Sequence, residues 1–134
     1  MRVVIYSMLA AILLLACAVT VPRFSSWKPQ ARITAAQTQL ATFATALDAF
    51  QVDTGSYPAS SPMDTNGLVA LVMPPPGVTN WSGPYLRDVP LDPWGNPYIC
   101  EVPGRHNRGA YDLLCSGPDG RAGTSDDIRN WTEK

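Results

Sequence analysis

The stretch ITAAQTQLATFATALDAF, residues 33–50, decides the fold because its apolar side chains recur at the spacing of a helix. They return every three or four positions, and polar side chains occupy the opposite side. The apolar positions are Ile33, Ala36, Leu40, Phe43, Leu47 and Phe50. The pattern predicts an amphipathic helix over Pro29–Val52, ended by Gly55 and Pro58. Such a helix has to bury its apolar face, and we expect it to pack on a small sheet.

An uncharged segment precedes this helix. Val3–Val21 contains 19 residues without Lys, Arg, Asp or Glu. As a helix it would span roughly 28 Å, about the hydrocarbon thickness of a bilayer. We therefore expect a membrane anchor. A cleaved signal peptide is one alternative, but no convincing small-x-small cleavage site precedes Pro22, and the apolar run is longer than most signal-peptide cores. Lipidation at Cys17, which follows Leu14-Leu15-Ala16 as in a lipobox, is another. We favour a cysteine that only fills a membrane helix.

Prolines separate the two helical runs and suggest how the chain is divided. Pro22 and Pro29 lie between them, and a proline breaks or kinks a helix. We assign residues 1–28 to the membrane helix and its junction, and residues 29–134 to a head domain.

Charge and motifs exclude several classes of function. The chain has 134 residues, with 10 Lys and Arg against 11 Asp and Glu. This balance argues against nucleic acid as a partner, because phosphate contacts need a basic face. The sole histidine, His106, lies between Arg105 and Arg108 in a predicted loop, where we expect it to be solvated. No Walker motif and no H-E-x-x-H is found. We therefore do not expect this chain to be an enzyme.

The remainder of the head reads as loops with a few short elements. Residues 56–103 are rich in Pro, Gly and Ser. Thr65 is a candidate N-cap for a short helix over Gly67–Val72, which three prolines then stop. Segments Tyr98–Val102 and Ala110–Cys115 flank residues 103–109 and predict a β-hairpin.

Two cysteines lie near the ends of the predicted hairpin strands. Folding the hairpin about residues 106–108 brings Cys100 and Cys115 approximately opposite each other. A disulfide between them would suit an oxidising compartment. Two buried, reduced thiols are the alternative, because spacing alone does not fix the geometry. We favour the disulfide.

The stretch CSGPDGRAGTSDDI, residues 115–128, is rich in acids and glycines. Asp119, Asp126 and Asp127 could supply carboxylates, and the glycines let the backbone turn inward. Calcium prefers such hard oxygen ligands, and magnesium suits the stretch less because it keeps its waters. The EF-hand spacing is missing, so spacing alone favours a polar turn without metal.

Several motifs, in this order along the chain, resemble the major pseudopilins of type II secretion systems, within the type IV pilin-like superfamily. The resemblance covers nearly the whole chain. It rests on the apolar helix ending at Pro22, its amphipathic continuation, DTGSYP (53–58), TNGLVALV (65–72), GPYLRDVPLDPWGNPY (83–98), SGPDG (116–120) and DDIRNW (126–131).

This resemblance implies an α+β, type IV pilin-like fold. A long N-terminal helix, half membrane and half amphipathic, would pack on a small head with a three-stranded antiparallel sheet and a C-terminal calcium loop. The implied Ca²⁺ ligands are the carboxylates of Asp119, Asp126 and Asp127 and the carbonyls of Ser116, Arg121 and Thr124.

The resemblance also implies a function. The chain would be a structural subunit of a periplasmic pseudopilus, which supports the export of folded proteins across the outer membrane. Its partners would be copies of itself, other pseudopilins, the inner-membrane secretion platform and inner-membrane lipid. It would lie in the bacterial inner membrane as a single-pass protein with a periplasmic head. The alternative is a membrane- or lipid-anchored periplasmic binding module that does not polymerise.

One position departs from the family pattern. Family precursors carry a short basic leader ending in Gly, and then Phe-Thr-Leu-x-Glu. Aligned on Pro22, Met1 stands where the processed chain starts, and Ile5 replaces the Glu. An Ile cannot make the pairing with a neighbouring amino terminus that the resemblance assigns to this Glu. The resemblance therefore does not decide whether a prepilin peptidase processes the chain. We expect the N-terminus to be retained, because no accepted cleavage signal precedes Pro22.

Overall fold

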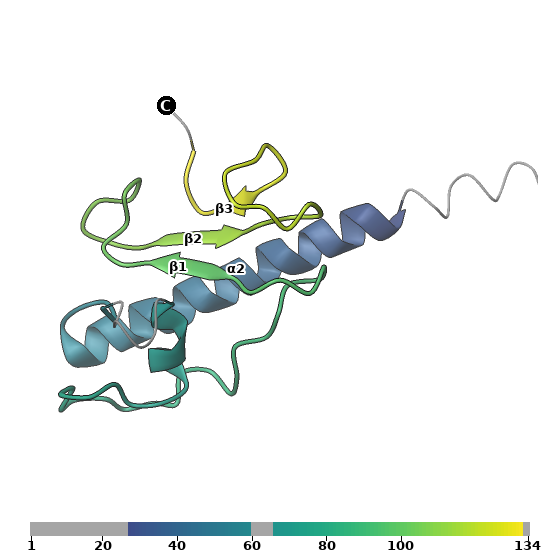
Figure 1. Ribbon diagram of the computed structural model, residues 1–134. Coiled ribbons are helices and arrows are strands. Elements are labelled where there is room, and N and C mark those ends of the chain that lie inside the picture. Colours follow the sequence, from purple (N-terminus) through teal and green to yellow (C-terminus); the bar gives the residue numbers. More distant parts are fainter. Residues whose placement is uncertain (1–26, 60–65, 133–134) are drawn as a thin grey trace, which may run out of the picture. The chain divides into compact units, whose positions relative to one another are not determined.

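A computed structural model describes residues 27–59 and 66–132 of the protein (Figure 1). The chain divides into two units, Met1–Arg32 and Ile33–Lys134, and the packing described below belongs to the second. The expected anchor Val3–Val21, with Ile5 and Cys17, lies outside the described residues. Within the described ranges, no helix is both long and apolar enough to cross a membrane.

The long helix α2 spans Trp27–Thr54, which confirms the predicted amphipathic helix with two more residues at each end. Its apolar stripe is buried as expected, at Ala36, Leu40, Phe43, Ala46, Leu47 and Phe50. Gly55 ends the helix with φ +85°, and its amide donates to the Gln51 carbonyl at 2.8 Å. A glycine adopts this left-handed conformation without the steric cost of a Cβ.

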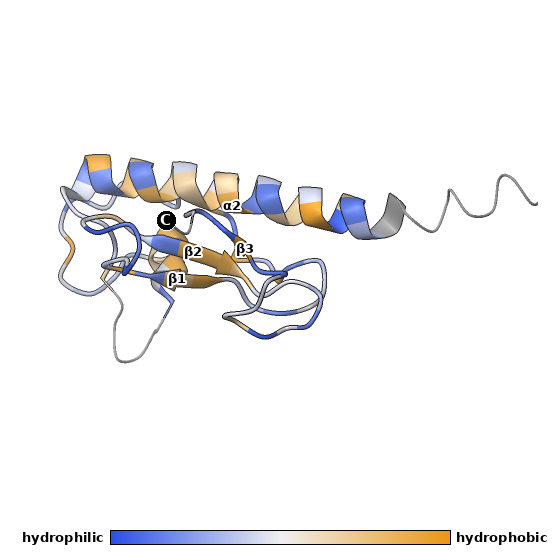
Figure 2. Cartoon of the chain, turned by 90° about the horizontal axis from the view of Figure 1, so that it is seen from above, coloured by the Kyte–Doolittle hydropathy of each residue, from blue (hydrophilic) through white to orange (hydrophobic). Residues whose placement is uncertain are grey.

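Three short strands form one antiparallel sheet in the order β1-β2-β3. They are β1 (Ile99–Glu101), β2 (Asp112–Cys115) and β3 (Ile128–Arg129). The first two confirm the predicted hairpin, with shorter strands than expected. The third agrees with the three-stranded sheet that the resemblance implied. Figures 1 and 2 show α2 running along one face of this sheet.

The short helix predicted over Gly67–Val72 is a 3₁₀ helix, η1 (Gly67–Leu71). The N-cap of η1 is Asn66, and the Asn66 side chain makes no capping hydrogen bond. The cap was therefore predicted one residue too early, and Thr65 itself lies outside the described residues. Asn66 instead donates through Nδ2 to the Tyr98 carbonyl at 2.6 Å. This bond fastens η1 to the segment that leads into β1.

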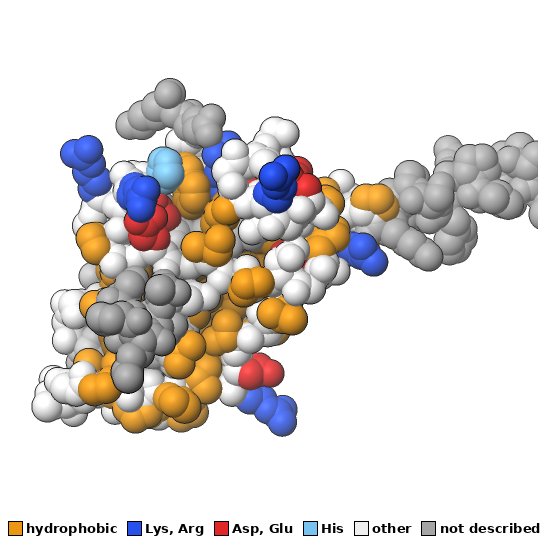
Figure 3. Space-filling model, viewed as in Figure 1, with side chains coloured by type: hydrophobic (Ala, Val, Ile, Leu, Met, Phe, Trp, Pro, Cys, Tyr) orange, Lys and Arg blue, Asp and Glu red, His pale blue; other side chains and the backbone are white. Residues whose placement is uncertain are grey.

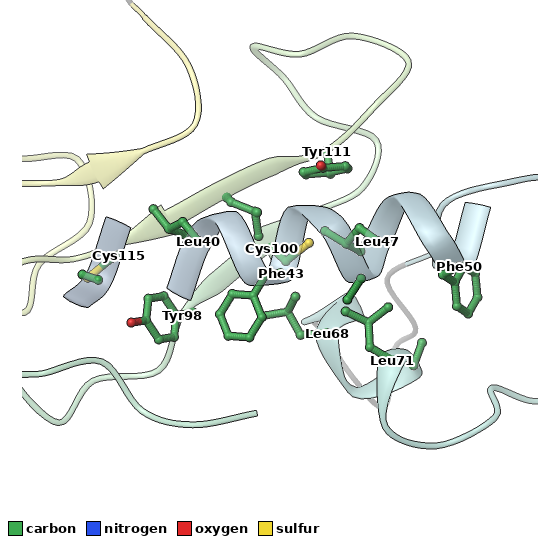
Figure 4. Close-up of a cluster of buried hydrophobic side chains, with 14 residues drawn as sticks. Leu40, Phe43, Leu47, Phe50, Leu68, Leu71, Tyr98, Cys100, Tyr111 and Cys115 are labelled. Carbon is green, nitrogen blue, oxygen red and sulfur yellow. The ribbon is translucent and has the colours of Figure 1, made fainter. Parts of the chain in front are cut away.

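The core lies between α2, η1 and the sheet (Figure 4). Phe43 meets Tyr98 edge to face, with ring centroids 5.0 Å apart, and Phe50 meets Tyr85 in the same way at 5.7 Å. Burial raises the pKa of Tyr98 to about 12, so this phenol stays neutral. Edge-to-face pairs add stability beyond the area that they bury.

We expect Phe43→Ala to destabilise the head by about 3–5 kcal/mol, because it removes a fully buried ring and leaves a cavity. Urea unfolding of the full chain in detergent measures this cost. Val52→Ala is the matched control, since Val52 is 82% exposed on the same helix. Equal midpoints for the two variants would contradict the packing described here.

Candidate metal site in the C-terminal loop

The acidic loop, residues 116–127, joins β2 to β3. Its two ends are held together because Cys115 pairs with Ile128 in the sheet. Gly117, with φ +64°, makes the first turn. A Cβ there would stand 2.5 Å from the Asp126 carbonyl oxygen, so only glycine allows the loop to close this tightly. The loop therefore returns its acidic end to its starting point.

The Asp126 carboxylate ties the two halves of this loop together. The Thr124 hydroxyl donates to Oδ1 at 2.5 Å, and the Asp119 amide donates to Oδ2 at 3.2 Å. The hydrogen bond from Thr124, supported by that from the Asp119 amide, holds the pKa of Asp126 below its ordinary value. Hydrogen bonds to a carboxylate favour its charged form.

The other two acids are bonded to the backbone of the same loop. Oδ1 of Asp119 accepts from the Arg121 amide at 2.8 Å. Oδ2 of Asp127 accepts from the amides of Gly123 at 2.7 Å and Thr124 at 3.1 Å. Oδ1 of Asp127 is buried and has no hydrogen-bond partner. A buried acceptor without a partner costs free energy, and a bound cation would satisfy it.

The loop offers the oxygen donors that calcium prefers, but these donors are not all gathered around one point. The carbonyls of Arg121 and Thr124 belong to the same turn. The Arg121 carbonyl lies 3.1 Å from the Thr124 hydroxyl, and the Thr124 carbonyl accepts from the Asp127 amide at 3.4 Å. Ser116 is buried at the start of the loop. Across the described ranges, no three or more His, Cys, Asp or Glu side chains stand together as a metal site. The structure thus brings the Asp126 carboxylate to the backbone amide of Asp119, but it does not gather all three carboxylates.

A second cluster fastens the hairpin loop. His106 is exposed in this loop, as expected, and it also makes contacts there that the sequence did not indicate. Oδ2 of Asp112 accepts from the amide of His106 at 2.8 Å and lies 2.9 Å from its Nδ1. Oδ1 accepts from the Asn107 amide at 2.9 Å. The His106 ring stacks on Trp131, with centroids 4.3 Å apart and planes 7° from parallel. His106, pale blue in Figure 3, is therefore at the surface but engaged on two sides.

Burial opposes the charge on Asp112, but the hydrogen bonds from His106 and Asn107 outweigh it. They hold the pKa of Asp112 below its ordinary value. The carboxylate therefore stabilises the hairpin loop in its charged form.

Asn130 extends this cluster to the end of β3. Its Oδ1 accepts from the Leu113 amide at 2.8 Å, and its Nδ2 donates to the Tyr111 carbonyl at 3.2 Å. The side chain thus continues the pairing of β3 with β2 beyond the two residues of the strand.

A hollow of about 610 Å³ lies between the hairpin loop and the acidic loop, lined among others by Leu114, Asp127 and Trp131.

Comparisons with known proteins agree with this arrangement. The family described as Type II secretion system (T2SS), protein G, matches residues 23–131. The chain belongs to this family. It is 40% identical over 121 residues to the Type II secretion system core protein G of Pseudomonas aeruginosa, with 85% of this chain and 81% of that protein covered. With the core protein G of Escherichia coli it shares 39% over 112 residues, covering 83% and 75% of the two chains.

A solved structure supports the same conclusion. The crystal structure of the major pseudopilin from the type 2 secretion system of enterohaemorrhagic Escherichia coli is 34% identical, with a TM-score of 0.65. The match covers 78% of this chain and 90% of that one. The pilin-like α+β fold expected from the resemblance is thereby confirmed.

In this protein G family member the expected Cys100–Cys115 disulfide is absent, and that prediction was wrong. Both sulfurs are buried thiols. Cys100 lies opposite Leu113 in the sheet, so Cys115 is its diagonal neighbour (Figure 4). Diagonal positions are roughly 7–8 Å apart, beyond the roughly 4.4–6.8 Å between Cα atoms that a disulfide usually spans.

The partner of Cys115 is Asp92, which the sequence analysis did not single out. Sγ of Cys115 donates to Oδ2 of Asp92 at 3.2 Å, and burial raises the pKa of this thiol to about 11. Oδ1 of Asp92 accepts from the amides of Trp94 and Asn96. Asp92 therefore holds its turn together and connects it to β2. The D-P-W-G run could have indicated such a turn, because an Asp commonly bonds the backbone two residues on.

We expect Asp112→Asn to lower the free energy of unfolding by about 1–3 kcal/mol near neutral pH, because it replaces a charged acceptor. The folded pKa of Asp112 lies below its unfolded value, about 3.9. Its stabilisation is therefore present above that value and lost as pH falls through the folded pKa. The difference between wild type and variant should shrink as pH falls from about 7 toward about 2.

Urea unfolding of both chains over this pH range measures the effect. Asp88→Asn is the control, since Asp88 is exposed. A difference between wild type and Asp112→Asn that stays constant with pH would contradict the assigned charge state.

Proposed function

We propose that this chain is a structural subunit of a type II secretion pseudopilus and that it supports export of folded proteins across the outer membrane. The observation that carries the proposal is the family match over residues 23–131. It includes both the amphipathic helix and the acidic loop. The fold supports the proposal, because a long helix with a small head suits a subunit whose role is packing rather than chemistry.

The proposed role is not enzymatic. The only histidine of the chain, His106, is engaged by Asp112 and stacked on Trp131, so it holds a loop. The thiol of Cys115 is buried and its pKa is raised, which disfavours a nucleophilic thiolate.

We further propose a single-pass location in the bacterial inner membrane, with Val3–Val21 as anchor and residues 29–134 in the periplasm. The support is the uncharged composition of that segment. The partners proposed are other copies of the chain, other pseudopilins, the secretion platform and membrane lipid. The alternative, a binding module that does not polymerise, would keep the same head without self-association.

Secretion by the native bacterium tests the role. Deleting the gene should abolish export of the proteins that the secretion system releases, and the full chain in trans should restore it. Filaments sheared from cells that overproduce the system should contain the chain. Normal export after deletion, together with a chain that stays monomeric in membranes, would favour the binding module.

We propose one Ca²⁺ in the acidic loop, held by the carboxylates of Asp119, Asp126 and Asp127 and the carbonyls of Ser116, Arg121 and Thr124. The buried Oδ1 of Asp127, which has no hydrogen-bond partner, supports this proposal, as do the hard oxygen donors. When bound, the ion would neutralise the mutual repulsion of the three acids. The loop would then hold the start of β3 more firmly.

We expect calcium to raise the unfolding midpoint of the full chain in detergent, because an ion that binds only the folded state stabilises it. The gain should reach about 2.7 kcal/mol at a hundredfold excess over Kd. Asp126→Ala should lose most of this gain, whereas Asp88→Ala should keep it.

Thermal unfolding in EGTA and in calcium gives the comparison, and titration calorimetry measures the binding itself. If the midpoints coincide and no heat of binding appears, the loop is a polar turn without metal.

A further inference from the structure

A turn outside the acidic loop, residues 92–96, lies against that loop. The Asp92 carboxylate closes this turn. Its Oδ1 accepts from the amides of Trp94 and Asn96, at 2.9 and 2.8 Å, and the Asp92 amide donates to the Asn96 carbonyl at 2.8 Å. Asp92 is only 5% exposed. The backbone of the turn is therefore fixed by hydrogen bonds of its own.

Two contacts join this turn to the acidic loop. Cys115, the residue before the loop, donates through Sγ to Oδ2 of Asp92 at 3.2 Å. The second contact lies inside the loop, where the carboxamide of Asn96 covers the side of Gly120 from which a side chain would project. A Cβ at Gly120 would stand 3.1 Å from Oδ1 and 3.4 Å from Nδ2 of Asn96. The turn thus restrains the loop at its start and again near its middle.

The contact at Gly120 falls between two of the proposed calcium ligands. Asp119 would supply a carboxylate oxygen and Arg121 a carbonyl oxygen. These two residues and Gly120 are exposed, so a contact that restrains this part of the loop bears on the position of both ligands. A site whose ligands are already held loses less conformational entropy when an ion binds. The Asn96 side chain should therefore favour calcium binding without touching the ion.

The turn also connects the acidic loop to the start of β1. Ile99 lies opposite Leu114, and Cys115 lies opposite Ile128. The start of β1, the end of β2 and the start of β3 therefore share one end of the sheet (Figure 1). The chain itself joins the loop to β2 and β3. Asn96, three residues before Ile99, adds a link to β1.

We propose that Asn96 is a positioning residue for calcium and that it couples the acidic loop to the turn before β1. The inference rests on the calcium site of the proposed function and adds a residue outside the loop. An ion that holds Asp119 and Arg121 also holds Gly120 against the Asn96 carboxamide. The coupling is reciprocal, because a turn that the ion steadies must raise the affinity for the ion by the same factor.

Titration of the folded full chain in detergent with calcium chloride, followed by calorimetry, tests the contact. Asn96→Ala removes the carboxamide but keeps the backbone amide that donates to Asp92. It should raise the Kd for calcium about tenfold, within the usual range of such couplings. Asn80→Ala, at an exposed asparagine of the loop after η1, should bind like wild type. Thermal unfolding in EGTA is the second measurement, since a residue that only stabilises the head would lower this midpoint and leave the Kd unchanged.

Hydrogen exchange of the wild-type chain tests the reverse direction and needs no variant. Calcium should slow exchange of the Trp94 and Asn96 amides by a larger factor than that of the Leu86 amide, which is bonded to another loop. In Asn96→Ala the Trp94 amide should lose this extra slowing.

Two results would overturn only this coupling. One is an equal Kd for wild type and Asn96→Ala, and the other is a Trp94 amide that responds to calcium no more than the Leu86 amide does. A wild-type chain that binds no calcium would overturn both the coupling and the proposed calcium site.

Discussion

The buried apolar stripe of α2 is the constraint on which the remainder of the head depends. Phe43, Leu47 and Phe50 are at most 1% exposed, and they contact residues from η1, the loops and the sheet. The sheet has strands of only two to four residues. A sheet this small is marginal alone, and packing on a helix stabilises it. The helix also depends on this packing, since most helical stability in proteins comes from tertiary contacts.

Polar contacts then hold the loops and strand ends that the apolar core does not fix. The Asp112 carboxylate closes the hairpin loop, the Asn130 side chain secures the end of β3, and the Asp92 carboxylate joins its own turn to Cys115. Each of these side chains replaces hydrogen bonds that short strands cannot supply. The acidic loop joins β2 to β3, two strands that these contacts hold in place. An ion bound in the loop would therefore help to hold β3 and the segment that follows it to Trp131.

The sequence could predict the elements with strong periodicity. The helix followed from apolar residues repeated over five turns, and the hairpin from two β-rich segments around a glycine-containing loop. The strand β3 has only two residues, too few for a pattern, and it was expected only from the family resemblance. The candidate metal ligands were found from composition and resemblance together, because acids and glycines alone also describe a polar turn.

The incorrect disulfide and the contacts that the sequence did not reveal share one physical cause, which is that register and rotamers depend on the folded environment. One residue pair in the sheet places Cys100 opposite Leu113, and this pairing rules out the disulfide. The role of His106 depends on Trp131, which is distant in the sequence and reaches the hairpin only through β3. The link between Asp92 and Cys115 likewise joins a loop to a strand. Sequence spacing contains no information on such contacts until the fold is known.

Hydrogen exchange of the full chain in lipid tests most directly whether helix and sheet stabilise each other. We expect the amides of Phe43–Phe50 and of Leu113–Leu114 to be the most protected in the head. They should share one opening free energy and the same dependence on urea, because neither element persists without the other. Exchange in the sheet while those helix amides stay protected would contradict this account.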